Sequence, residues 1–284
     1  MDRVIGRTVV VTGGARGIGF ATAAVLLTRG ARVVIGDRDQ GALDAAVAEL
    51  ATAGAVSGHL LDVSDRRSFA DFLDLARADG RGRIDVLINN AGVMPVGAFI
   101  GQTQQAIRSS IEVNLYGVLN GCQLVLPEMV ARRKGHIINI ASMAGVMAIP
   151  GQVVYAATKY GVVGLSVAMA DEFASRGVQV SVVMPPFTQT DLIAGTKSSG
   201  VGKPVKPEVV ATAIVGALDK PRTHVSIPQP VRFVGPVVSM LGPRSRRWFN
   251  KRIGADKLFL DDVDHAARAF YEERAQSALG VVEQ

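Results

Sequence analysis

The chain has 284 residues, of which 48% are hydrophobic and 31 are glycine, a composition that allows one large core with many tight turns. Its formal net charge of +6 is concentrated in residues 220–255, which hold eight basic residues and no acidic one. No recognition module for nucleic acid accompanies this charge, so we expect no nucleic-acid partner.

The cysteine and histidine content argues against two further kinds of site. Cys122 is the only cysteine, so no intrachain disulfide can form, and a reducing cytoplasm fits. The four histidines are scattered without ligand spacing, which argues against a metal site. Because the sequence shows neither a signal peptide nor an uninterrupted apolar run of about 18 residues, we expect a cytoplasmic protein.

Short β-branched runs alternate along the chain with helical patterns. The expected strands are 7–13, 31–37, a run ending at 60–63, 84–90, 136–141, 178–184 and 223–227, and the expected helices are 18–29, 41–52, 65–78, 103–133, 152–175 and 207–219. Continuous apolar strands between amphipathic helices predict a parallel sheet covered on both faces. We therefore predict an α/β, doubly wound Rossmann fold with seven parallel strands. No linker divides residues 1–228, which we expect to form one domain, followed by a helical extension at 229–284.

A glycine-rich turn joins the first expected strand to the first expected helix, where residues 12–19 read TGGARGIG. Glycines permit a tight turn and close approach of the backbone. The helix N-terminus also offers free N–H groups and the positive end of its dipole to a pyrophosphate. This favours a dinucleotide site over a purely structural turn. The residues expected to contribute are Gly13, Arg16, Gly17, Ile18 and Gly19.

Asp37 ends the second expected strand, where an acidic side chain would accept the hydroxyls of the adenosine ribose and repel a 2′-phosphate. This favours NAD over NADP. Arg16 and Arg38 could each pair with such a phosphate, so NADP remains an alternative. Asp62, at the end of the third strand, is expected either to meet the adenine or only to cap the following turn.

Tyr155 and Lys159 lie four residues apart in a run typical of a long helix. Residues at i and i+4 share a helical face, so the phenol and the ammonium would project side by side. A nearby positive charge favours the phenolate and would lower a tyrosine pKa from about 10 toward the range of a useful acid or base. Ser142 follows an apolar run and is expected at a strand end. The alternative is a surface Tyr–Lys pair, because this spacing is common by chance.

Taken together, these residues occur in a characteristic order and spacing. The segments are TGGARGIG at 12–19, Asp62, NNAG at 89–92, Asn114 within EVNLYG, Ser142 and YAATK at 155–159. The combination resembles the short-chain dehydrogenase/reductase family over about residues 5–228. The resemblance implies an enzyme that transfers a hydride between a nicotinamide cofactor and a carbonyl compound or secondary alcohol.

The resemblance also implies roles for individual residues. Tyr155 would donate or accept the hydroxyl proton, Lys159 would lower the pKa of Tyr155 and hold the nicotinamide ribose, and Ser142 would bind the substrate oxygen. Asn114 would hold a water that links Lys159 to solvent, a role that in the family accompanies the bridging of a helix irregularity. Further cofactor contacts are implied for Val63, Asn90, Ala91 and Gly92.

One segment departs from the family pattern of Pro-Gly, a branched apolar residue and Thr: here the chain reads PPFTQT at 185–190. Pro186 lacks a backbone N–H and fixes φ, which would reshape the substrate-side wall. We nevertheless expect cofactor contacts from Pro185, Thr188 and Thr190, with Thr188 at the nicotinamide carboxamide and Thr190 near the phosphates.

The loops expected around the substrate are almost uncharged. Residues 93–99, 143–149 and 186–203 are rich in Met, Val, Ile and Phe, which predicts a lipid-derived, terpenoid or steroid-like alcohol or ketone as substrate. Two alternatives stay open, an NADP(H)-dependent carbonyl reductase and a non-catalytic nucleotide-sensing or membrane-docked protein. Proteins of the resembled family are commonly dimers or tetramers, and we expect the same here.

The C-terminal extension is basic first and acidic later. Residues 229–255 interleave apolar residues with arginines and include Trp248, the only tryptophan, and residues 261–278 read as an acidic-to-mixed helix. A basic amphipathic segment with Trp and Phe can lie on an anionic membrane surface, while Arg and Trp also suit a protein contact. A flap that closes the substrate pocket or the oligomer interface is the third alternative.

Overall fold

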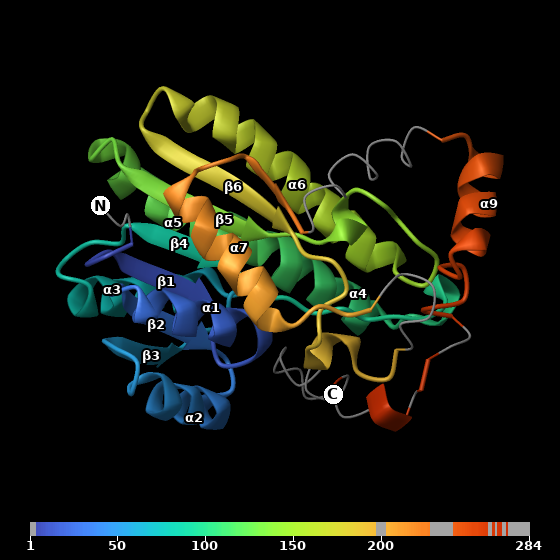
Figure 1. Cartoon of the computed structure of the whole chain (residues 1–284), viewed down its shortest axis with the longest axis horizontal. Coiled ribbons are helices and arrows are strands. Elements are labelled where there is room, and N and C mark those ends of the chain that lie inside the picture. The colour runs from blue at the N-terminus through green and yellow to red at the C-terminus, as the bar shows by residue number, and fades with distance from the viewer. Residues whose placement is uncertain are drawn as a thin grey trace.

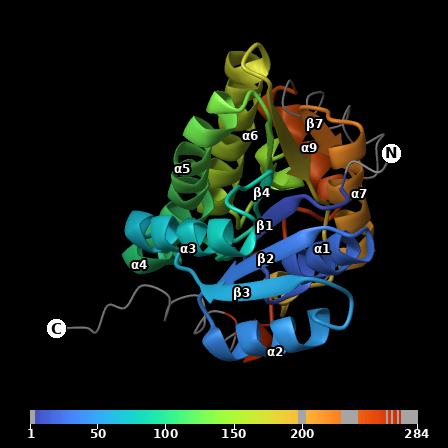
Figure 2. The same ribbon diagram turned by 90° about the vertical axis from the view of Figure 1, so that its left-hand side faces the viewer.

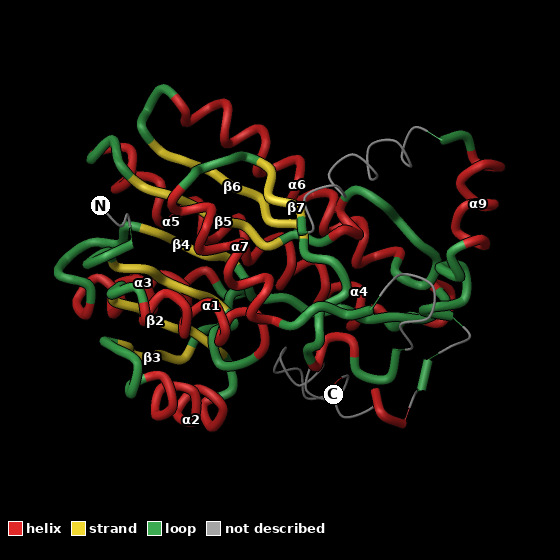
Figure 3. Tube along the Cα trace, viewed as in Figure 1, coloured by secondary structure: helices red, strands yellow, loops and turns green. Residues whose placement is uncertain are grey.

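The computed structural model describes residues 4–196, 203–227, 241–260, 263–264, 266–268 and 271. In this part of the chain, seven strands form one sheet in the order β3-β2-β1-β4-β5-β6-β7, and every neighbouring pair is parallel (Figures 1 and 3). The strands are β1 (Thr8–Thr12), β2 (Arg32–Asp37), β3 (Val56–Leu60), β4 (Val86–Asn89), β5 (Gly135–Ile140), β6 (Val178–Met184) and β7 (His224–Ser226). The predicted doubly wound sheet is confirmed.

The strands are connected mainly by helices, which cover both faces of the sheet. The helices are α1 (Gly17–Thr28), α2 (Gln40–Leu50), α3 (Arg66–Asp79), α4 (Gln104–Ile111), α5 (Gly117–Ala131), α6 (Val153–Ala174) and α7 (Pro207–Asp219), with α9 (Pro243–Arg252) in the C-terminal extension. Four single turns complete the described elements: η1 (Phe99–Gly101), the π-helical η2 (Glu112–Tyr116), η3 (Met143–Gly145) and η4 (Asp191–Ile193). Figure 2 shows α1, α2 and α7 on one side of the sheet and α3, α5 and α6 on the other.

The core is divided into two layers by the pleat of the sheet. Val9 and Val11 pack into the layer under α1, α2 and α7, while Val10 packs into the layer under α3, α5 and α6. This follows because successive side chains of a strand point to opposite faces. The strand order reverses between β1 and β4, so the carboxyl ends of these two strands open into the crevice where ligands of doubly wound sheets bind.

One predicted helix is interrupted. The expected helix at 103–133 is three consecutive segments, α4, the π turn η2 and α5. The third strand ends at Leu60, the first residue of the run 60–63 in which it was expected to end, so Asp62 follows the strand by two residues. The helix expected at 261–278 lies largely outside the described residues.

Helix α6 is, within the described ranges, the one helix long and apolar enough to cross a membrane by length and composition. Its buried residues include Tyr155, Lys159, Val162 and Met169, and the last two belong to the core layer between α6 and the sheet. Its apolar character is therefore explained by packing against the sheet.

Candidate active site

The glycine turn lies at the carboxyl end of β1 and leads directly into α1. Gly13 has φ +63°, and a Cβ at this position would lie 2.8 Å from the Cα of Ala91, so this close approach of the two strand ends requires glycine. Gly17, Ile18 and Gly19 form the first turn of α1, and the Arg16 side chain does not cap this helix. The N–H groups of the first turn are thus available to an anion, as a pyrophosphate requires.

Asn90 and Thr12 connect the glycine turn to the end of β4. The Asn90 amide Nδ2 donates to the carbonyl oxygens of Thr12 and Gly13 at 3.0 and 2.9 Å. The Thr12 hydroxyl accepts from the backbone N–H groups of Asn90 and Ala91 at 3.0 and 3.1 Å. These bonds fix the floor of the crevice between β1 and β4. Asn90 was predicted to line the cofactor groove, whereas the bracing role of Thr12 was missed.

Asp37 lies at the end of β2, beside the glycine turn. Its carboxylate accepts from the backbone N–H of Ala15 at 3.2 Å and of Asp39 at 3.3 Å, which holds it at the crevice edge. Arg16 is engaged by Asp39, with Nη2 2.6 Å from a carboxylate oxygen, while the other oxygen of Asp39 caps α2. Arg38 also takes part in an interaction within the fold. Asp39 is a second acid at this edge that the sequence reasoning did not single out.

Asp62 and Val63 lie in the turn after β3. Asp62 Oδ1 accepts from the backbone N–H and the hydroxyl of Ser64 at 2.9 and 2.6 Å, so the carboxylate does cap the following turn. Val63 is buried, and its carbonyl oxygen accepts from Asn120 at 3.1 Å. Both residues are held at the same end of the sheet as Asp37.

Tyr155 and Lys159 project from one face of α6 into the end of β5. Both are buried, with relative exposures of 5% and 4%, so the alternative of a surface Tyr–Lys pair is wrong. The Lys159 ammonium lies 5.7 Å from the centre of the Tyr155 ring and donates to the carbonyl oxygen of Ile140 at 2.9 Å. Ser142 follows β5 and caps η3, with its hydroxyl accepting from the N–H of Ala144 at 3.1 Å.

Burial dominates the acidity of both groups in this structure. It raises the pKa of Tyr155 to about 12, a rise opposed by the hydrogen bond with Ser142 and increased by Tyr271. Burial also lowers the pKa of Lys159 to about 8. The expected lowering of the Tyr155 pKa by Lys159 is therefore not seen, because the loss of hydration on burial is the largest effect and raises this pKa.

Asn114 lies within the π turn η2, which confirms the helix irregularity. Its side chain makes a two-way connection to Val93: Oδ1 accepts from the Val93 N–H and Nδ2 donates to the Val93 carbonyl, both at 2.8 Å. Nδ2 also donates to the Thr158 hydroxyl at 3.2 Å, so Asn114 joins the NNAG segment to α6. Thr158, between the catalytic Tyr and Lys in sequence, was not singled out beforehand.

Gly92 lies between the ends of Asn114 and Lys159. A Cβ on Gly92 would lie 3.2 Å from Asn114 Oδ1 and 3.5 Å from Lys159 Nζ. A side chain here would enter the space around both polar groups. The geometry thus brings Gly92, Asn114 and Lys159 together, as the sequence reasoning expected for residues around the nicotinamide end.

The segment after β6 is held in place despite Pro186. The Pro185 carbonyl accepts from the N–H of Met143 at 3.0 Å, and the Thr188 hydroxyl donates to the Pro186 carbonyl at 2.8 Å. Thr190 lies against the glycine turn, because its Cγ2 is 3.0 Å from where a Cβ on Gly17 would be. Thr190 is therefore near the expected phosphate position.

Residues of the C-terminal extension close the apolar side of the site. Leu258 and Phe259 are fully buried in one cluster with Tyr155, Met94 and Ala144. Leu258 and Phe259 therefore lie where a flap would, which was one alternative for the extension, while residues 229–240 lie outside the described residues. No local sequence pattern predicts this contact, because it joins segments more than 100 residues apart.

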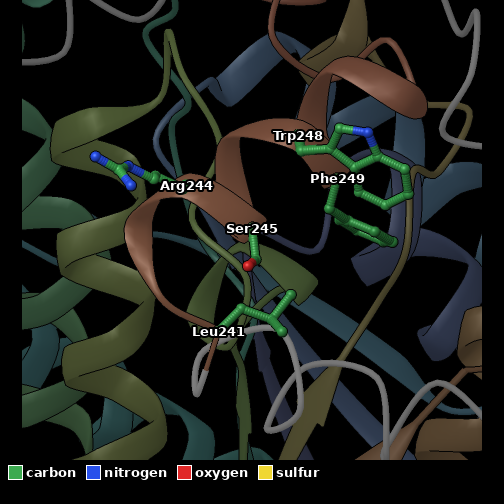
Figure 4. A pocket seen from close by; sticks show the side chains of 5 residues that line it. All are labelled: Leu241, Arg244, Ser245, Trp248 and Phe249. Atoms are coloured by element: carbon green, nitrogen blue, oxygen red, sulfur yellow. The ribbon is translucent and has the colours of Figure 1, made fainter.

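A separate hollow of about 450 Å³ lies on α9 (Figure 4). It is lined by Leu241, Arg244, Ser245, Trp248 and Phe249. Trp248 and Phe249 lie next to each other, and the Arg244 guanidinium extends in another direction. Within the described residues no group of three or more His, Cys, Asp and Glu side chains could hold a metal ion.

Comparison with known protein families gives one clear match. The family model described as short chain dehydrogenase matches residues 7–199. The 3-oxoacyl-(acyl-carrier-protein) reductase FabG of Thermotoga maritima is 35% identical over 75% of this chain and 90% of its own. Carbonyl reductase family member 4 of Xenopus tropicalis is 35% identical over 74% of this chain and 90% of its own.

Two solved structures extend the similarity to three dimensions. A short-chain dehydrogenase/reductase from Burkholderia phymatum, crystallised in complex with NAD, superposes with a TM-score of 0.77 at 26% identity and covers 84% of this chain and 95% of its own. Levodione reductase superposes with a TM-score of 0.71 at 27% identity, with coverage of 78% and 96%.

Proposed function

Because the chain belongs to the short-chain dehydrogenase/reductase family and is an NAD(P)-dependent oxidoreductase acting on CH–OH donors, we propose that it interconverts a hydrophobic secondary alcohol and its ketone with NAD(H). The observation that carries this proposal is the position of Tyr155. Its phenol is buried beside Ser142 and Lys159, in one cluster with the apolar side chains of Met94, Ala144, Leu258 and Phe259.

The protein residues supply proton transfer and orientation. A nicotinamide held at the crevice would supply the hydride acceptor for oxidation and the hydride donor for reduction. Ser142 and Tyr155 hold the substrate oxygen, and Tyr155 takes the hydroxyl proton during oxidation or gives it during reduction. Lys159 stabilises the phenolate by its charge, while Asn114 fixes the Val93 backbone beside it.

The preference for NAD rests on the acids at the end of β2. Asp37 would accept the ribose hydroxyls, and Asp39 engages Arg16, which would otherwise be free to pair with a 2′-phosphate. A 2′-phosphate here would meet two carboxylates. This arrangement supports NAD and weakens the alternative of an NADP(H)-dependent reductase.

The hydrophobic substrate is supported by the lining of the site. Met94 and Phe259 share a buried apolar cluster with Tyr155, and Ile149, Phe187 and Leu192 pack against that cluster. A sugar acid or small hydroxy acid would lose its hydration against these side chains. A lipid-derived, terpenoid or steroid-like alcohol would gain from burial.

The test is turnover by the wild type and by Tyr155→Phe with NAD⁺ and two sets of alcohols. We expect the wild type to oxidise lipophilic secondary alcohols and not small polar hydroxy acids. Tyr155→Phe should lose about 10² to 10⁴ of the rate, as for removal of a general base, and keep cofactor binding. Turnover of the hydroxy acids alone would overturn the substrate class, and an active Tyr155→Phe variant would overturn the mechanism.

The surface suggests how such an enzyme is placed in the cell. Helix α9 exposes five basic residues, Arg244, Arg246, Arg247, Lys251 and Arg252, and Trp248 is 68% exposed. Figure 1 shows α9 at the margin of the molecule, away from the sheet. We therefore propose a cytoplasmic enzyme whose α9 contacts an anionic membrane surface, from which a lipophilic substrate could be taken.

We also propose a homodimer or homotetramer. The exposed large apolar side chains include Tyr116 on η2 and Val153 and Tyr160 on α6, with relative exposures of 56%, 48% and 39%. Packing between copies along α6 would bury them. Light scattering after size exclusion should give a mass of two or four chains, and a single-chain mass would contradict this proposal.

A further inference from the structure

Tyr271, near the C-terminus, lies over the catalytic site. Its hydroxyl accepts from the backbone N–H of Met94 at 2.8 Å, and its side chain is buried, with 8% relative exposure. Met94 itself belongs to the apolar cluster that contains Tyr155. A charge on the Tyr271 phenol would oppose ionisation of Tyr155, so the two phenols are close enough to interact.

Arg268 holds this part of the chain against two loops of the site. Its guanidinium is fully buried and donates to the carbonyl oxygens of Ala194 at 3.0 Å, Leu192 at 3.3 Å and Met94. It also lies 4.9 Å from the centre of the Tyr271 ring, within the range of a cation–π contact. Arg268 therefore holds both the Tyr271 ring and the backbone of Met94, whose N–H is hydrogen-bonded to the Tyr271 hydroxyl.

Three further contacts hold C-terminal residues against the segment that follows β6. The Asp264 N–H donates to the Gly195 carbonyl at 2.7 Å, and Val263 forms a β-bridge with Thr196. Phe259 packs against Phe187 with ring centres 5.7 Å apart. The wall that results is built from the segments after β4 and β6 and from the C-terminal residues.

This inference rests on the proposed function. We propose that Tyr271 is a specificity-determining residue, which closes the substrate chamber beside Tyr155 and limits the bulk of the apolar body that can enter, and that Arg268 is its positioning residue. Because Tyr155 is only 5% exposed under this wall, a substrate must fit against Tyr271 or displace it. Substrate size is therefore selected by a residue outside the segment that the family model matches, which ends at residue 199.

The first test needs neither cofactor nor substrate. Amide hydrogen exchange of the full chain is measured for Tyr271→Phe and for Tyr160→Phe, which alters a tyrosine that is 39% exposed on α6. Tyr271→Phe removes the acceptor of the Met94 N–H, so we expect exchange at Met94 to be at least tenfold faster than in the wild type, with no change in Tyr160→Phe. Unchanged exchange at Met94 in Tyr271→Phe would overturn the inference.

The second test measures size preference with NAD⁺ and two alcohols, cyclohexanol and the bicyclic decahydro-2-naphthol. In Tyr271→Ala, kcat/KM for the bicyclic alcohol divided by kcat/KM for the monocyclic alcohol should rise about tenfold. Changes in how a substrate fits an apolar pocket have effects of this magnitude. Arg268→Lys keeps the charge but loses the planar fork, and should shift the ratio in the same direction through KM with little change in kcat. NADH binding should be unchanged in both variants.

The outcomes separate the two proposals. A wild type that oxidises neither alcohol sinks the proposed function, and with it the role in specificity. A wild type that turns over both, with the same size preference in Tyr271→Ala and Arg268→Lys, sinks only the inference. Faster exchange at Met94 together with a shifted ratio supports it.

Discussion

Single residues determine the chemistry of this site because they fix the positions of its polar groups and loops. Tyr155 and Lys159 are buried, Asn114 joins two loops, and Gly92 leaves space between polar groups that a side chain would fill. The spacing of Tyr155 and Lys159 could be predicted because i and i+4 share a helical face. Their pKa values could not be predicted, because burial depends on neighbours that are distant in sequence.

Replacing Gly92 with alanine should reduce turnover. The added Cβ would lie 3.2 Å from Asn114 Oδ1, tighter than an ordinary contact, and would displace Asn114 or Lys159 by a few tenths of an ångström. We expect kcat to fall about tenfold, since small misplacements at the reacting centre cost rate. The control is Gly101→Ala, where a Cβ would meet nothing within 4 Å. Equal activity of the two variants would show that the space at Gly92 has no catalytic role.

Asp39→Asn should improve NADPH binding. The amide keeps an oxygen that can cap α2 but loses the charge that engages Arg16 at 2.6 Å. Since the pair is partly exposed, we expect the Kd for NADPH to fall about fivefold and the Kd for NADH to change little. Asp44→Asn, on the same helix, is the control. An unchanged NADPH affinity would mean that Arg16 plays no part in cofactor choice.

The elements of the fold were largely predictable, with informative exceptions. Alternating apolar strands and helices gave the sheet and its helices, because local periodicity determines which face is buried. The expected helix at 103–133 contains the π turn at Glu112–Tyr116, and helical periodicity did not give its bounds because π turns are rare and occur mostly as single turns inside α-helices. The docking of Leu258, Phe259, Arg268 and Tyr271 could not be predicted, because it depends on contacts distant in sequence.

Strand β5 carries a histidine that should make stability depend on pH. His136 Nε2 lies 2.8 Å from the Ser181 hydroxyl, which donates its own proton to the Arg222 carbonyl, so His136 must be the donor in its neutral form. Burial, with a smaller effect of Arg7, lowers the His136 pKa from 6.5 to about 4. Between these values the unfolded chain binds the extra proton, so stability falls as the pH drops from 6.5 to 4, by about 3 kcal/mol in total.

Urea unfolding at pH 7 and pH 4.5 measures this loss. His136→Gln should lose less stability on acidification than the wild type, and His224→Gln, which alters an exposed histidine, should lose as much as the wild type. The same acid sensitivity in all three proteins would contradict the assignment to His136.

At the scale of the whole molecule, the C-terminal extension has two different parts. Residues 255–271 include buried side chains that close the site, whereas α9 exposes its basic residues and Trp248. Charge counting along the chain separated a basic segment that ends at residue 255 from an acidic one that follows it. It did not show which of the two closes the site, since that depends on which side chains the rest of the fold covers.

Vesicle binding tests the proposed contact between α9 and a membrane. The wild type should bind phosphatidylglycerol vesicles and not phosphatidylcholine vesicles, with the emission of Trp248 shifting to shorter wavelength and the binding weakened by 0.5 M salt. Arg247→Glu should reduce affinity at least fivefold, whereas Lys134→Glu, which alters an exposed lysine just before β5, should not. Absence of binding to either vesicle would exclude the membrane contact.

The most direct test of the account is a fluorescence titration of the purified wild type with NADH and, separately, with NADPH. It requires no knowledge of the substrate. We expect tighter binding of NADH, because Asp37 lies beside the glycine turn, where it would meet the ribose, and Asp39 engages Arg16. Tighter binding of NADPH would contradict the assigned role of these acids, and binding of neither would contradict the assignment of the crevice between β1 and β4 as a dinucleotide site.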